Sequence, residues 1–361
     1  MSEPAEIRLG ELGYPIVVAE SVRRSLREFA RERSLRRFVV LCDRNVAADA
    51  GEAARALGGR VPVLGFELGE RRKRLSTLEE VLDALARAGA DRGTVVVGVG
   101  GGVASDLFGL AAALYMRGVP YVHVATSLVA MVDAAIGGKN GVDLGGGKNL
   151  AGTFRDPIAV FCGVRALRTL PFRHLREGLA EVVKHGVIEG HDLFSALEVL
   201  APHPFAQWPW ETIVAESIAV KAMIVNDDRT ELGARETLNL GHTFAHAIER
   251  ASDFRISHGA AVAVGLRAAG LLAIRTGRFS YDEHLRVLAL LALLGMPMRT
   301  SLAPAAIFAA MSSDKKRRER RLRFVLPRAI GDVEYGIQAP RADVLAVLRC
   351  CTRDPGLEEF R

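Results

Sequence analysis

The sequence is poor in cysteine and aromatic residues, and it has no long apolar run. Its four cysteines, at positions 42, 162, 350 and 351, are scattered and form no C-x-x-C pair, which argues against a disulfide framework. No apolar stretch approaches the roughly 20 residues of a membrane-spanning helix. Residues 1–6 lack the basic start and apolar core of a signal peptide. We therefore expect a soluble, reduced, cytoplasmic protein with no membrane partner.

Positive charge is only moderately in excess. The formal net charge is +6 and the isoelectric point is about 9.3, values that also occur in nucleic-acid-binding proteins. Aromatic residues make up only 6% of the chain, however, and most basic residues are spread among acidic ones. Two basic clusters stand out, residues 71–74 and residues 315–318 running on to Arg323. We interpret them as solvated faces or as contacts to a phosphorylated substrate, and we expect no nucleic-acid partner.

The first half of the chain alternates strand and helix patterns. Residues 37–43, 95–99 and 118–124 predict buried strands, and residues 75–90 predict an amphipathic helix. Continuous apolar strands that alternate with helices indicate a parallel, Rossmann-like sheet covered on both faces. Binding sites in such sheets gather at the carboxyl ends of the strands. Asp43, a glycine turn, Thr126 and Ser127 all stand at such ends.

The glycine turn follows the strand at 95–99. Gly100, Gly101 and Gly102 lead into a small-residue helical pattern that contains Asp106. A strand, a glycine loop and a helix N-terminus form the arrangement in which backbone N–H groups meet a pyrophosphate. The spacing is not G-x-G-x-x-G, because Val103 stands at the third glycine position. The segment is therefore either a phosphate-binding loop or a tight turn of an α/β domain.

After about residue 171 the pattern becomes mostly helical. Helices are predicted at 182–200, 211–225, 237–251, 260–276 and 281–294, and strand signals return only near 323–326. We infer an α/β N-terminal dinucleotide-binding domain over residues 1–171, followed by a mostly α-helical metal-binding domain over residues 172–361. A ligand is expected in a cleft between the two domains, because such clefts are favoured sites.

Three histidines lie close together in the helical half. His242 and His246 are four residues apart, so on a helix they share one face, and His258 follows shortly after. Paired imidazoles of this kind commonly hold a transition metal, whereas a lone core histidine is usually only a hydrogen-bonded polar group. The spacing alone favours His242 with His246 as a metal or anion site.

The central segment is rich in cations beside glycine turns and within apolar helices. Glu181 and Lys184 are three residues apart and share a helix face. Any single lysine here is more safely interpreted as a surface charge. So many cations in apolar surroundings nevertheless require anionic partners. The group comprises Lys139, Lys148, Lys184, Lys221 and Arg235, with Asp133, Asn149 and Asn239 nearby. A substrate that carries both phosphate and carboxylate would provide those partners.

The order of motifs resembles the 3-dehydroquinate synthase family, within the sugar-phosphate cyclase superfamily. The matching pieces are GGGVASD, YMRG, VDAAIGGKNGVD, GKNLAGTF, LRTLP, GLAEVVKHG, NLGHTFAHAIE, SHGAAVAVG, and DKK followed by RFVLP. They occur in the family's order across roughly residues 43–327. Each motif alone is moderately specific, and together they are highly specific for the superfamily.

The resemblance implies an NAD-dependent, metal-dependent enzyme that converts 3-deoxy-D-arabino-heptulosonate 7-phosphate into 3-dehydroquinate and phosphate. Its metal, Zn²⁺ or Co²⁺, would be held by Glu181, His242 and His258, and His246 would contact the substrate phosphate instead. This revises the choice made from helical spacing alone. A carboxylate and two imidazoles leave coordination positions open for substrate oxygens.

The resemblance also assigns the remaining site residues. NAD contacts would come from Asp43, Asn45, Glu70, Lys73, Gly101, Gly102, Val103, Asp106, Thr126, Ser127, Asp133, Lys139, Lys148, Thr169 and Leu170. The substrate pocket would contain Asp133, Lys139, Asn149, Lys184, Lys221, Arg235, Asn239, His246 and the pair Lys315 and Lys316. Arg117 would reach the phosphate from a neighbouring subunit, which implies a homodimer. Lys221 and Arg235 suit the substrate carboxylate, because a guanidinium grips a carboxylate in bidentate fashion.

The sequence departs from the family's usual pattern at four positions. Ala125 stands where proline is common, Asn140 where threonine is common, Gly163 where aspartate is usual and His174 where glutamate is usual. These positions concern the NAD side or turns, and they leave substrate choice open. The alternatives are a related cyclase that makes an aminated or carboxylate-free ring, and a metal-dependent polyol dehydrogenase, which would accumulate NADH.

Overall fold

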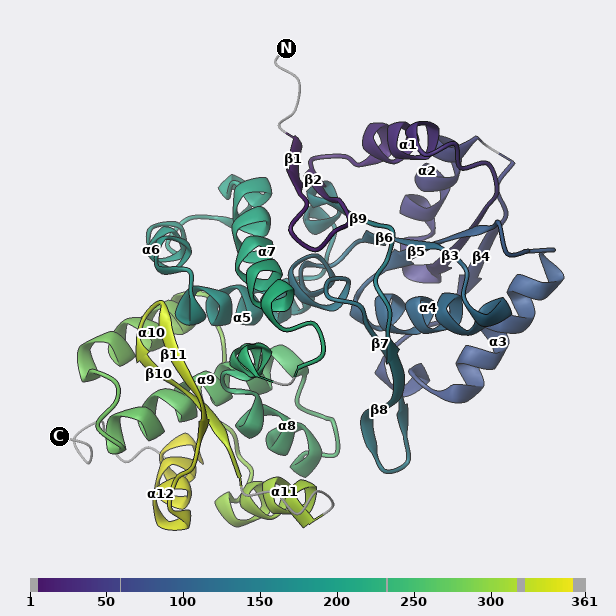
Figure 1. Cartoon of the computed structure of the whole chain (residues 1–361). Coiled ribbons are helices and arrows are strands. Elements are labelled where there is room, and N and C mark those ends of the chain that lie inside the picture. Colours follow the sequence, from purple (N-terminus) through teal and green to yellow (C-terminus); the bar gives the residue numbers. More distant parts are fainter. Residues whose placement is uncertain (1–5, 59, 232, 317–321, 353–361) are drawn as a thin grey trace. The chain divides into compact units, whose positions relative to one another are not determined.

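The computed structural model describes residues 6–58, 60–231, 233–316 and 322–352 (Figure 1). The chain divides into two compact units. The first comprises residues 1–175 and 209–226, and the second comprises residues 176–208 and 227–361. The helix over 210–227 therefore packs with the α/β half although it follows the first helices of the second unit. The two units are defined by which residues pack together and not by what they bind. The boundary expected after residue 171, between a dinucleotide-binding and a metal-binding domain, therefore stays a prediction.

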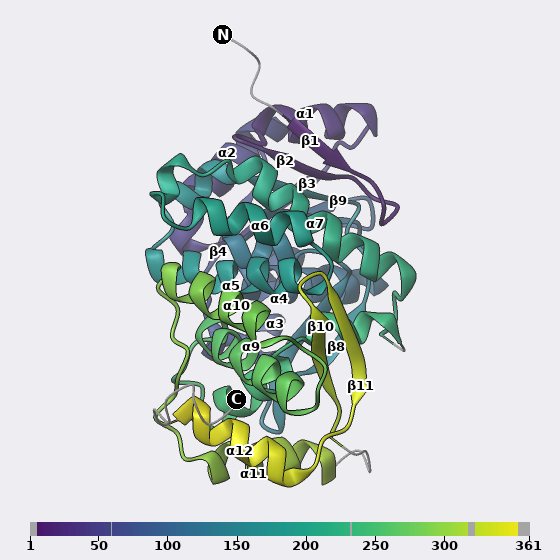
Figure 2. The ribbon, with the colours of Figure 1, turned by 90° about the vertical axis from the view of Figure 1, so that its left-hand side faces the viewer.

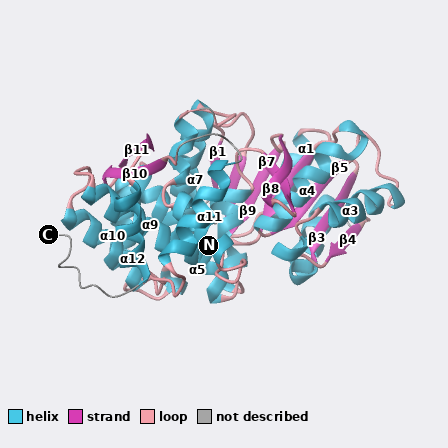
Figure 3. Ribbon diagram, turned by 90° about the horizontal axis from the view of Figure 1, so that it is seen from below, coloured by secondary structure: helices cyan, strands magenta, loops and turns pink. Residues whose placement is uncertain are grey.

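The first unit is built on a Rossmann-like sheet. Among the described residues the sheet has seven strands in the order β1-β2-β9-β6-β5-β3-β4. Their bounds are β1 Glu6–Leu9, β2 Ile16–Ala19, β3 Phe38–Asp43, β4 Val63–Phe66, β5 Val95–Gly100, β6 Tyr121–Ala125 and β9 Ala159–Gly163. All neighbours pair in parallel except β1 with β2. The predicted parallel sheet is confirmed, and Figure 3 shows its strands in magenta.

Helices cover both faces of this sheet, as its continuous apolar strands require. Helix α1 (Arg23–Glu32) and helix α2 (Ala47–Leu57) bury Leu26, Phe29 and Ala53 against one face. Helix α3 (Leu75–Arg87) and helix α4 (Gly102–Leu114) bury Leu85 and Phe108 against the other. The strands β3 and β5 are buried along almost their whole length, which explains why they read as uninterrupted apolar runs in the sequence.

A hairpin extends from the first unit after strand β6. Strand β7 (Lys139–Leu144) pairs antiparallel with strand β8 (Gly147–Phe154), from Lys139 opposite Phe154 to Leu144 opposite Gly147. Glycine at 152 is required, because a Cβ there would lie 2.1 Å from the carbonyl oxygen of Asn140. The hairpin was not predicted from the sequence, since its glycine-rich strands lack a clear alternation of apolar residues.

The second unit is mostly helical, as expected. Its helices are α5 (Phe172–Ile188, which begins in the first unit), α6 (His191–Leu200), α8 (His242–Ala251), α9 (His258–Arg275), α10 (Tyr281–Leu293), α11 (Pro304–Lys316) and α12 (Arg341–Thr352), whereas α7 (Trp210–Asp227) packs with the first unit. A hairpin of β10 (Phe324–Ala329) and β11 (Asp332–Ile337) lies beside α9 (Figure 2). This hairpin accounts for the strand signal near residue 323.

Two helix predictions were wrong at their ends. The segment expected as one helix over 182–200 is divided into α5 and α6, because Gly190 caps a new helix. The helix expected from residue 237 begins at His242 instead, after a 3-10 turn over Ala234–Asn239 and Gly241 at φ 76°. A Cβ at Gly241 would lie 2.9 Å from the backbone nitrogen of Leu266, so glycine lets α8 approach α9.

Helix α9 is the exception to the expected lack of a membrane-length apolar segment. The helix has 18 residues and a mean hydropathy of 1.2, so by length and composition alone it could span a membrane. However, 78% of the stretch is buried inside the protein. Residues such as Val262, Leu266 and Leu271 are at most 4% exposed. Burial in the core of the second unit accounts for this composition.

Candidate functional site

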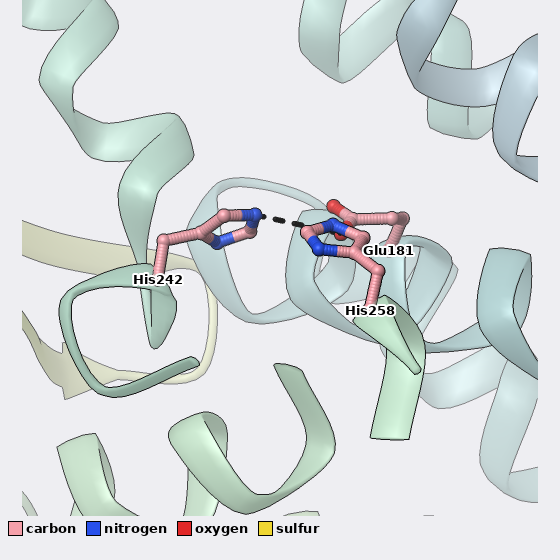
Figure 4. A group of neighbouring side chains, drawn as sticks. All are labelled: Glu181, His242 and His258. Carbon is pink, nitrogen blue, oxygen red and sulfur yellow. Dashed lines mark hydrogen bonds and ion pairs between the residues drawn. The ribbon is translucent and has the colours of Figure 1, made fainter. Parts of the chain in front are cut away.

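Three side chains from separate helices converge in the second unit. Glu181 comes from α5, His242 from the first residue of α8 and His258 from the first residue of α9. Each offers one ligand atom, and these atoms lie within 4.8 Å of one another. Figure 4 shows the two imidazoles directed toward the carboxylate. Glu181 is 0% exposed, so the arrangement lies within the protein rather than on a solvated face.

A close approach between helices brings these residues together. Gly259 follows His258, and a Cβ at Gly259 would lie 2.3 Å from the Cα of Glu177 in α5. Only glycine allows α9 to begin so near α5. Glu177 lies one helical turn before Glu181 in α5, so this approach brings the start of α9, and with it His258, beside Glu181. The glycine of the SHG motif therefore has a local role in forming the cluster.

The hydrogen bonds orient both histidines in the same way. Nδ1 of His242 lies 3.1 Å from the carbonyl oxygen of Leu240, and Nδ1 of His258 lies 3.3 Å from Oε2 of Glu249. The two Nε2 atoms lie 3.6 Å and 3.1 Å from the same oxygen, Oε1 of Glu181. Acceptors at Nδ1 favour the tautomer that leaves Nε2 available as a ligand. The donor set and its orientation therefore fit a divalent metal ion.

The cluster brings acidic and basic side chains together in a buried setting, and the pKa values of its members are shifted in different directions. Burial raises the pKa of Glu181, but Lys184 and the two histidines outweigh it and hold that pKa well below its usual range. Burial, with Lys184, lowers the pKa of His242 to about 3. Burial also lowers the pKa of His258, but its bonds to Glu181 and Glu249 prevail and raise it to about 10. The cationic form of the His258 imidazole is therefore favoured beside Glu181 and Glu249, whereas the His242 imidazole is neutral.

His246 lies beside the cluster without joining it. Its ring centroid is 5.3 Å from that of His242 and 6.4 Å from that of His258, and its side chain is exposed on α8. Among the described residues, His246 belongs to no group of three or more ligand atoms that lie within 4.8 Å of one another, whereas His242 and His258 are grouped with Glu181. The geometry thus favours the ligand set implied by family resemblance over the pair chosen from helical spacing, while the roles themselves stay predictions.

In the first unit, the predicted nucleotide contacts gather at the carboxyl ends of adjacent strands. Asp43 ends β3, and its Oδ1 accepts a hydrogen bond from the backbone nitrogen of Asn45 at 3.0 Å. Gly101 caps α4, and a Cβ there would lie 3.0 Å from Oγ of Ser127. Thr126 follows β6 and donates its N–H to the carbonyl of Gly100 at 2.9 Å. The first N–H groups of an α-helix have no partner within the helix, so the start of α4 offers hydrogen-bond donors to an anionic ligand.

Lys73 joins several of the predicted residues. It is 5% exposed, pairs with Asp106 and donates to Oδ1 of Asn149 at 2.5 Å. Burial raises the pKa of Asp106 to about 6, although Lys73 opposes the shift. Lys148 lies 2.5 Å from Glu70 in the same region. The first unit therefore brings together Glu70, Lys73, Asp106 and Lys148, which are predicted to contact NAD, with Asn149, which is predicted to contact substrate.

The predicted carboxylate-binding residues already have protein partners. Lys221, on α7, pairs with the carboxylate of Asp133 and donates to its carbonyl oxygen at 2.5 Å. Arg235 is 1% exposed and donates to the carbonyl oxygen of Arg229 at 2.6 Å. Asn239 donates to Oε1 of Glu231 at 3.2 Å. Lys221 belongs to the first unit, whereas Arg235 and Asn239 belong to the second.

The remaining predicted residues are more dispersed. Val103 and Gly102 lie in the first turn of α4, and Thr169 and Leu170 follow a 3-10 turn over Val164–Arg168. Lys139 is exposed at the start of β7, and Arg117 is exposed with φ 67°. Lys315 and Lys316 end α11, and their side chains lie outside the described residues.

Glu249 is a residue that the sequence analysis missed. It is 2% exposed and lies against a predicted metal ligand. A signal was present, because Glu249 follows His242 by seven residues and therefore lies on the same face of α8. A carboxylate on the helix face that also carries His242 and His246 could have been noted from the sequence.

The four departures from the family pattern have distinct surroundings. Asn140 donates to the Tyr121 hydroxyl at 3.1 Å and to the carbonyls of Gly138 and Arg155 at 3.1 Å and 2.9 Å. Nε2 of His174 accepts from Arg173 at 3.2 Å. Ala125 ends β6 and Gly163 ends β9, and both line a hollow at the carboxyl ends of these strands. None of the four touches the Glu181 cluster within the contacts described.

Comparison with known families covers most of the chain. Residues 63–177 match the model described as 3-dehydroquinate synthase N-terminal, and residues 178–317 match 3-dehydroquinate synthase C-terminal. The chain belongs to the 3-dehydroquinate synthase family. A curated 3-dehydroquinate synthase from Opitutus terrae is 39% identical over 340 residues, which are 92% of this chain and 94% of the relative. The resemblance inferred from the motifs is confirmed.

Solved structures of related cyclases share the fold of this family member. A 2-epi-5-epi-valiolone synthase from Streptomyces hygroscopicus, with NAD⁺ and Zn²⁺ bound, matches with a TM-score of 0.84 and 30% identity over 94% of this chain and 96% of its own. A 2-deoxy-scyllo-inosose synthase, complexed with carbaglucose-6-phosphate, NAD⁺ and Co²⁺, matches with a TM-score of 0.83 and 25% identity over 96% of this chain and 100% of its own. The predicted fold class is thereby confirmed.

Proposed function

We propose that this protein is a 3-dehydroquinate synthase, which converts 3-deoxy-D-arabino-heptulosonate 7-phosphate into 3-dehydroquinate and phosphate. The observation that carries the proposal is the buried cluster of Glu181, His242 and His258 in a chain that matches the family along most of its length. The net reaction is that of a carbon–oxygen lyase that eliminates phosphate, although its first step is an oxidation.

Glu181 and the Nε2 atoms of His242 and His258 would hold a zinc or cobalt ion. Such an ion, when bound, polarises substrate oxygens that carry developing charge. The chain's own contribution is to fix the ligands: Leu240 and Glu249 accept from the Nδ1 atoms, and Lys184 pairs with Glu181. Only one carboxylate and two imidazoles come from the protein, which leaves coordination positions for substrate.

The first unit would bind NAD at the carboxyl edge of its sheet. Asp43, at the end of β3, would accept hydrogen bonds from ribose hydroxyls, and the N–H groups around Gly101 and Gly102, at the start of α4, would meet the pyrophosphate. NAD supplies the hydride acceptor and donor that no side chain can provide. The pairing of Lys73 with Asn149 supports a nucleotide site that adjoins the substrate contacts.

The cationic residues would bind and orient the substrate. Arg235 and Lys221 would receive the carboxylate, and His246, Lys139 and the Lys315–Lys316 pair would receive the phosphate. Asn149 and Asn239 would hold hydroxyl groups in one geometry. Fixed positive charges beside the phosphate stabilise it as a leaving group, because they need no reorganisation during the reaction.

We further propose that the enzyme is soluble and cytoplasmic and acts as a homodimer. Arg117 supports the dimer, since it is exposed at a turn with φ 67°, where it is available to a neighbouring subunit. Sedimentation equilibrium tests the dimer directly. A monomer with full activity would contradict a role for Arg117 in the active site of the neighbouring subunit.

The activity is tested by incubating the protein with the heptulosonate phosphate, NAD and zinc, and by following phosphate release together with product mass. The proposal predicts equal amounts of phosphate and 3-dehydroquinate and no net NADH. Accumulation of NADH would instead indicate a polyol dehydrogenase. Turnover only of sugar phosphates without a carboxylate would indicate a cyclase of the kind represented by the two solved relatives.

A further inference from the structure

We propose that Glu249 is a positioning residue of the metal centre, which holds the His258 imidazole in the tautomer and orientation that present Nε2 to the metal ion. The inference rests on the proposed function, because it takes Glu181, His242 and His258 as the ligands. Glu249 itself would not touch the ion or the substrate; it would act through His258.

The contact between the two side chains is specific in its atoms. Oε2 of Glu249 lies 3.3 Å from Nδ1 of His258, on the side of the ring opposite the Nε2 atom that faces Glu181. An ionised carboxylate can only accept hydrogen bonds, so this contact places the ring proton on Nδ1. When a metal ion takes the place of the proton on Nε2, that nitrogen supplies its lone pair to the ion while Nδ1 keeps its bond to Glu249. Carboxylates in this relation to ligating histidines fix the ring and raise its basicity.

Hydrogen bonds in the turn after Glu249 hold this residue in position relative to His258. The carbonyl of Glu249 accepts from Phe254 N at 2.8 Å and from Ser252 Oγ at 2.8 Å. Ser252 Oγ in turn accepts from Ile256 N at 3.2 Å. Asp253 and Phe254 adopt left-handed φ values of 53° and 55°. This hydrogen-bonded turn fixes the distance between the end of α8, where Glu249 lies, and the start of α9, where His258 lies.

The two histidines differ in the group that holds Nδ1. His242 uses the neutral carbonyl of Leu240, whereas His258 uses the buried carboxylate of Glu249. A carboxylate with 2% exposure is costly to bury unless a positive or donating partner compensates it. We therefore expect removal of Glu249 to weaken the metal centre through His258, while the contact of His242 is left intact.

The experiment compares Glu249→Ala and Glu249→Gln with the wild-type protein and with Glu189→Gln, an exposed carboxylate at the end of α5. Zinc dissociation constants are measured by competition with a chromophoric chelator, and thermal midpoints are measured on the demetallated proteins. We expect Glu249→Ala to bind zinc about 10–100-fold more weakly. Glu249→Gln, whose amide oxygen still accepts a hydrogen bond, should lose about 3–10-fold, and Glu189→Gln should match the wild type.

A merely structural role for Glu249 predicts a different pattern. It would lower the thermal midpoint of the demetallated protein and leave the zinc dissociation constant unchanged, and that result would overturn the inference. If Glu249→Ala does not fold, the same decision rests on Glu249→Gln, whose equality with the wild type would overturn it. A wild-type protein that fails to bind zinc would overturn the metal centre itself, which distinguishes the two failures.

Discussion

Lys73 donates a hydrogen bond to Oδ1 of Asn149 at 2.5 Å and thereby ties the turn after β4 to the β7–β8 hairpin. The same ammonium group pairs with Asp106 of α4, and the backbone reinforces the link, since Asp143 N donates to the Lys73 carbonyl at 2.7 Å. One buried cation thus joins a predicted nucleotide contact to a predicted substrate contact within the first unit.

We predict that Lys73→Met lowers the free energy of unfolding by about 3 kcal/mol at neutral pH, because it leaves the Asp106 carboxylate, whose side chain is only 18% exposed, without its cation. It should also weaken NAD binding, since the hairpin and the turn after β4 lose their link. Urea denaturation measures the first effect and calorimetric titration with NAD the second.

The neighbouring Arg72 provides the control for this prediction. Arg72 pairs with Glu80 at 2.6 Å, but both side chains are about half exposed, at 45% and 48%. Exposed pairs contribute about 0–1 kcal/mol, so Arg72→Met should change stability little. Similar effects of the two substitutions would show that the Lys73 pair is not the buried link described above.

Gly109 in α4 leaves room for Asn140, one of the departures from the family pattern. A Cβ at Gly109 would lie 1.8 Å from Oδ1 of Asn140, and Asn140 is itself held by three hydrogen bonds. We predict that Gly109→Ala destabilises the protein by about 1–3 kcal/mol, the usual cost of overpacking. The loss should be smaller when Asn140→Ala is also present, which a double-mutant cycle measures.

Gly51 in α2 is the matched control, because its Cβ would meet only the Nη1 atom of Arg55, at 3.3 Å. Both substitutions bring the same gain in helix propensity, about 0.5–1 kcal/mol. Gly51→Ala should therefore be neutral or stabilising by urea denaturation. A stabilising Gly109→Ala would contradict the packing of α4 against Asn140.

We expect the burial of His284 to make the stability of the protein depend on pH. It is 0% exposed, burial lowers its pKa to about 4, and neither ring nitrogen has a hydrogen-bond partner among the described residues. The unfolded chain, with a histidine pKa near 6.5, binds more protons between pH 4 and pH 6.5. The free energy of unfolding should therefore fall as the pH falls through this window, by about 3 kcal/mol from this group.

The non-titrating variant His284→Leu tests that origin. Urea midpoints measured from pH 7 to pH 4 should fall less steeply for the variant than for the wild type. Part of the slope should remain, because burial also lowers the pKa of His123 to about 4. An unchanged slope would show that His284 does not carry the effect.

Arg235→Ala should weaken binding of the carboxylate-bearing substrate by about 1.5–3 kcal/mol, the usual contribution of a hydrogen bond to a charged group. The loss should shrink for an analogue without carboxylate. Because Arg235 is 1% exposed, the thermal midpoint of the variant is measured alongside the two dissociation constants. An equal loss for both ligands in a folded variant would show that Arg235 does not recognise that group.

The central sheet could be predicted from the sequence because burial on both faces makes its strands apolar throughout. The strands expected at 37–43 and 95–99 correspond to β3 and β5. The β7–β8 hairpin could not be found in this way. Its glycines serve close backbone approaches, such as that of Gly152 to Asn140, and these leave no periodic apolar signal.

The sequence indicated which kinds of residue form the candidate site, but local spacing did not indicate which of them lie together. Helical spacing pairs His242 with His246, but the partner observed beside Glu181 is His258, from the next helix. That contact depends on the approach of α9 to α5 at Gly259, which local spacing cannot reveal. The family motifs name the same three residues because they reflect a shared tertiary arrangement, and the metal-binding role of these residues stays a prediction.

Metal analysis of two purified variants, His258→Ala and His246→Ala, tests the account most directly. His258→Ala removes one of three proposed protein ligands, so its zinc content after dialysis should collapse. His246→Ala should keep its zinc, because His246 lies outside the ligand cluster, and should bind the phosphate-bearing substrate poorly. Loss of zinc from His246→Ala and its retention by His258→Ala would contradict the proposed metal centre.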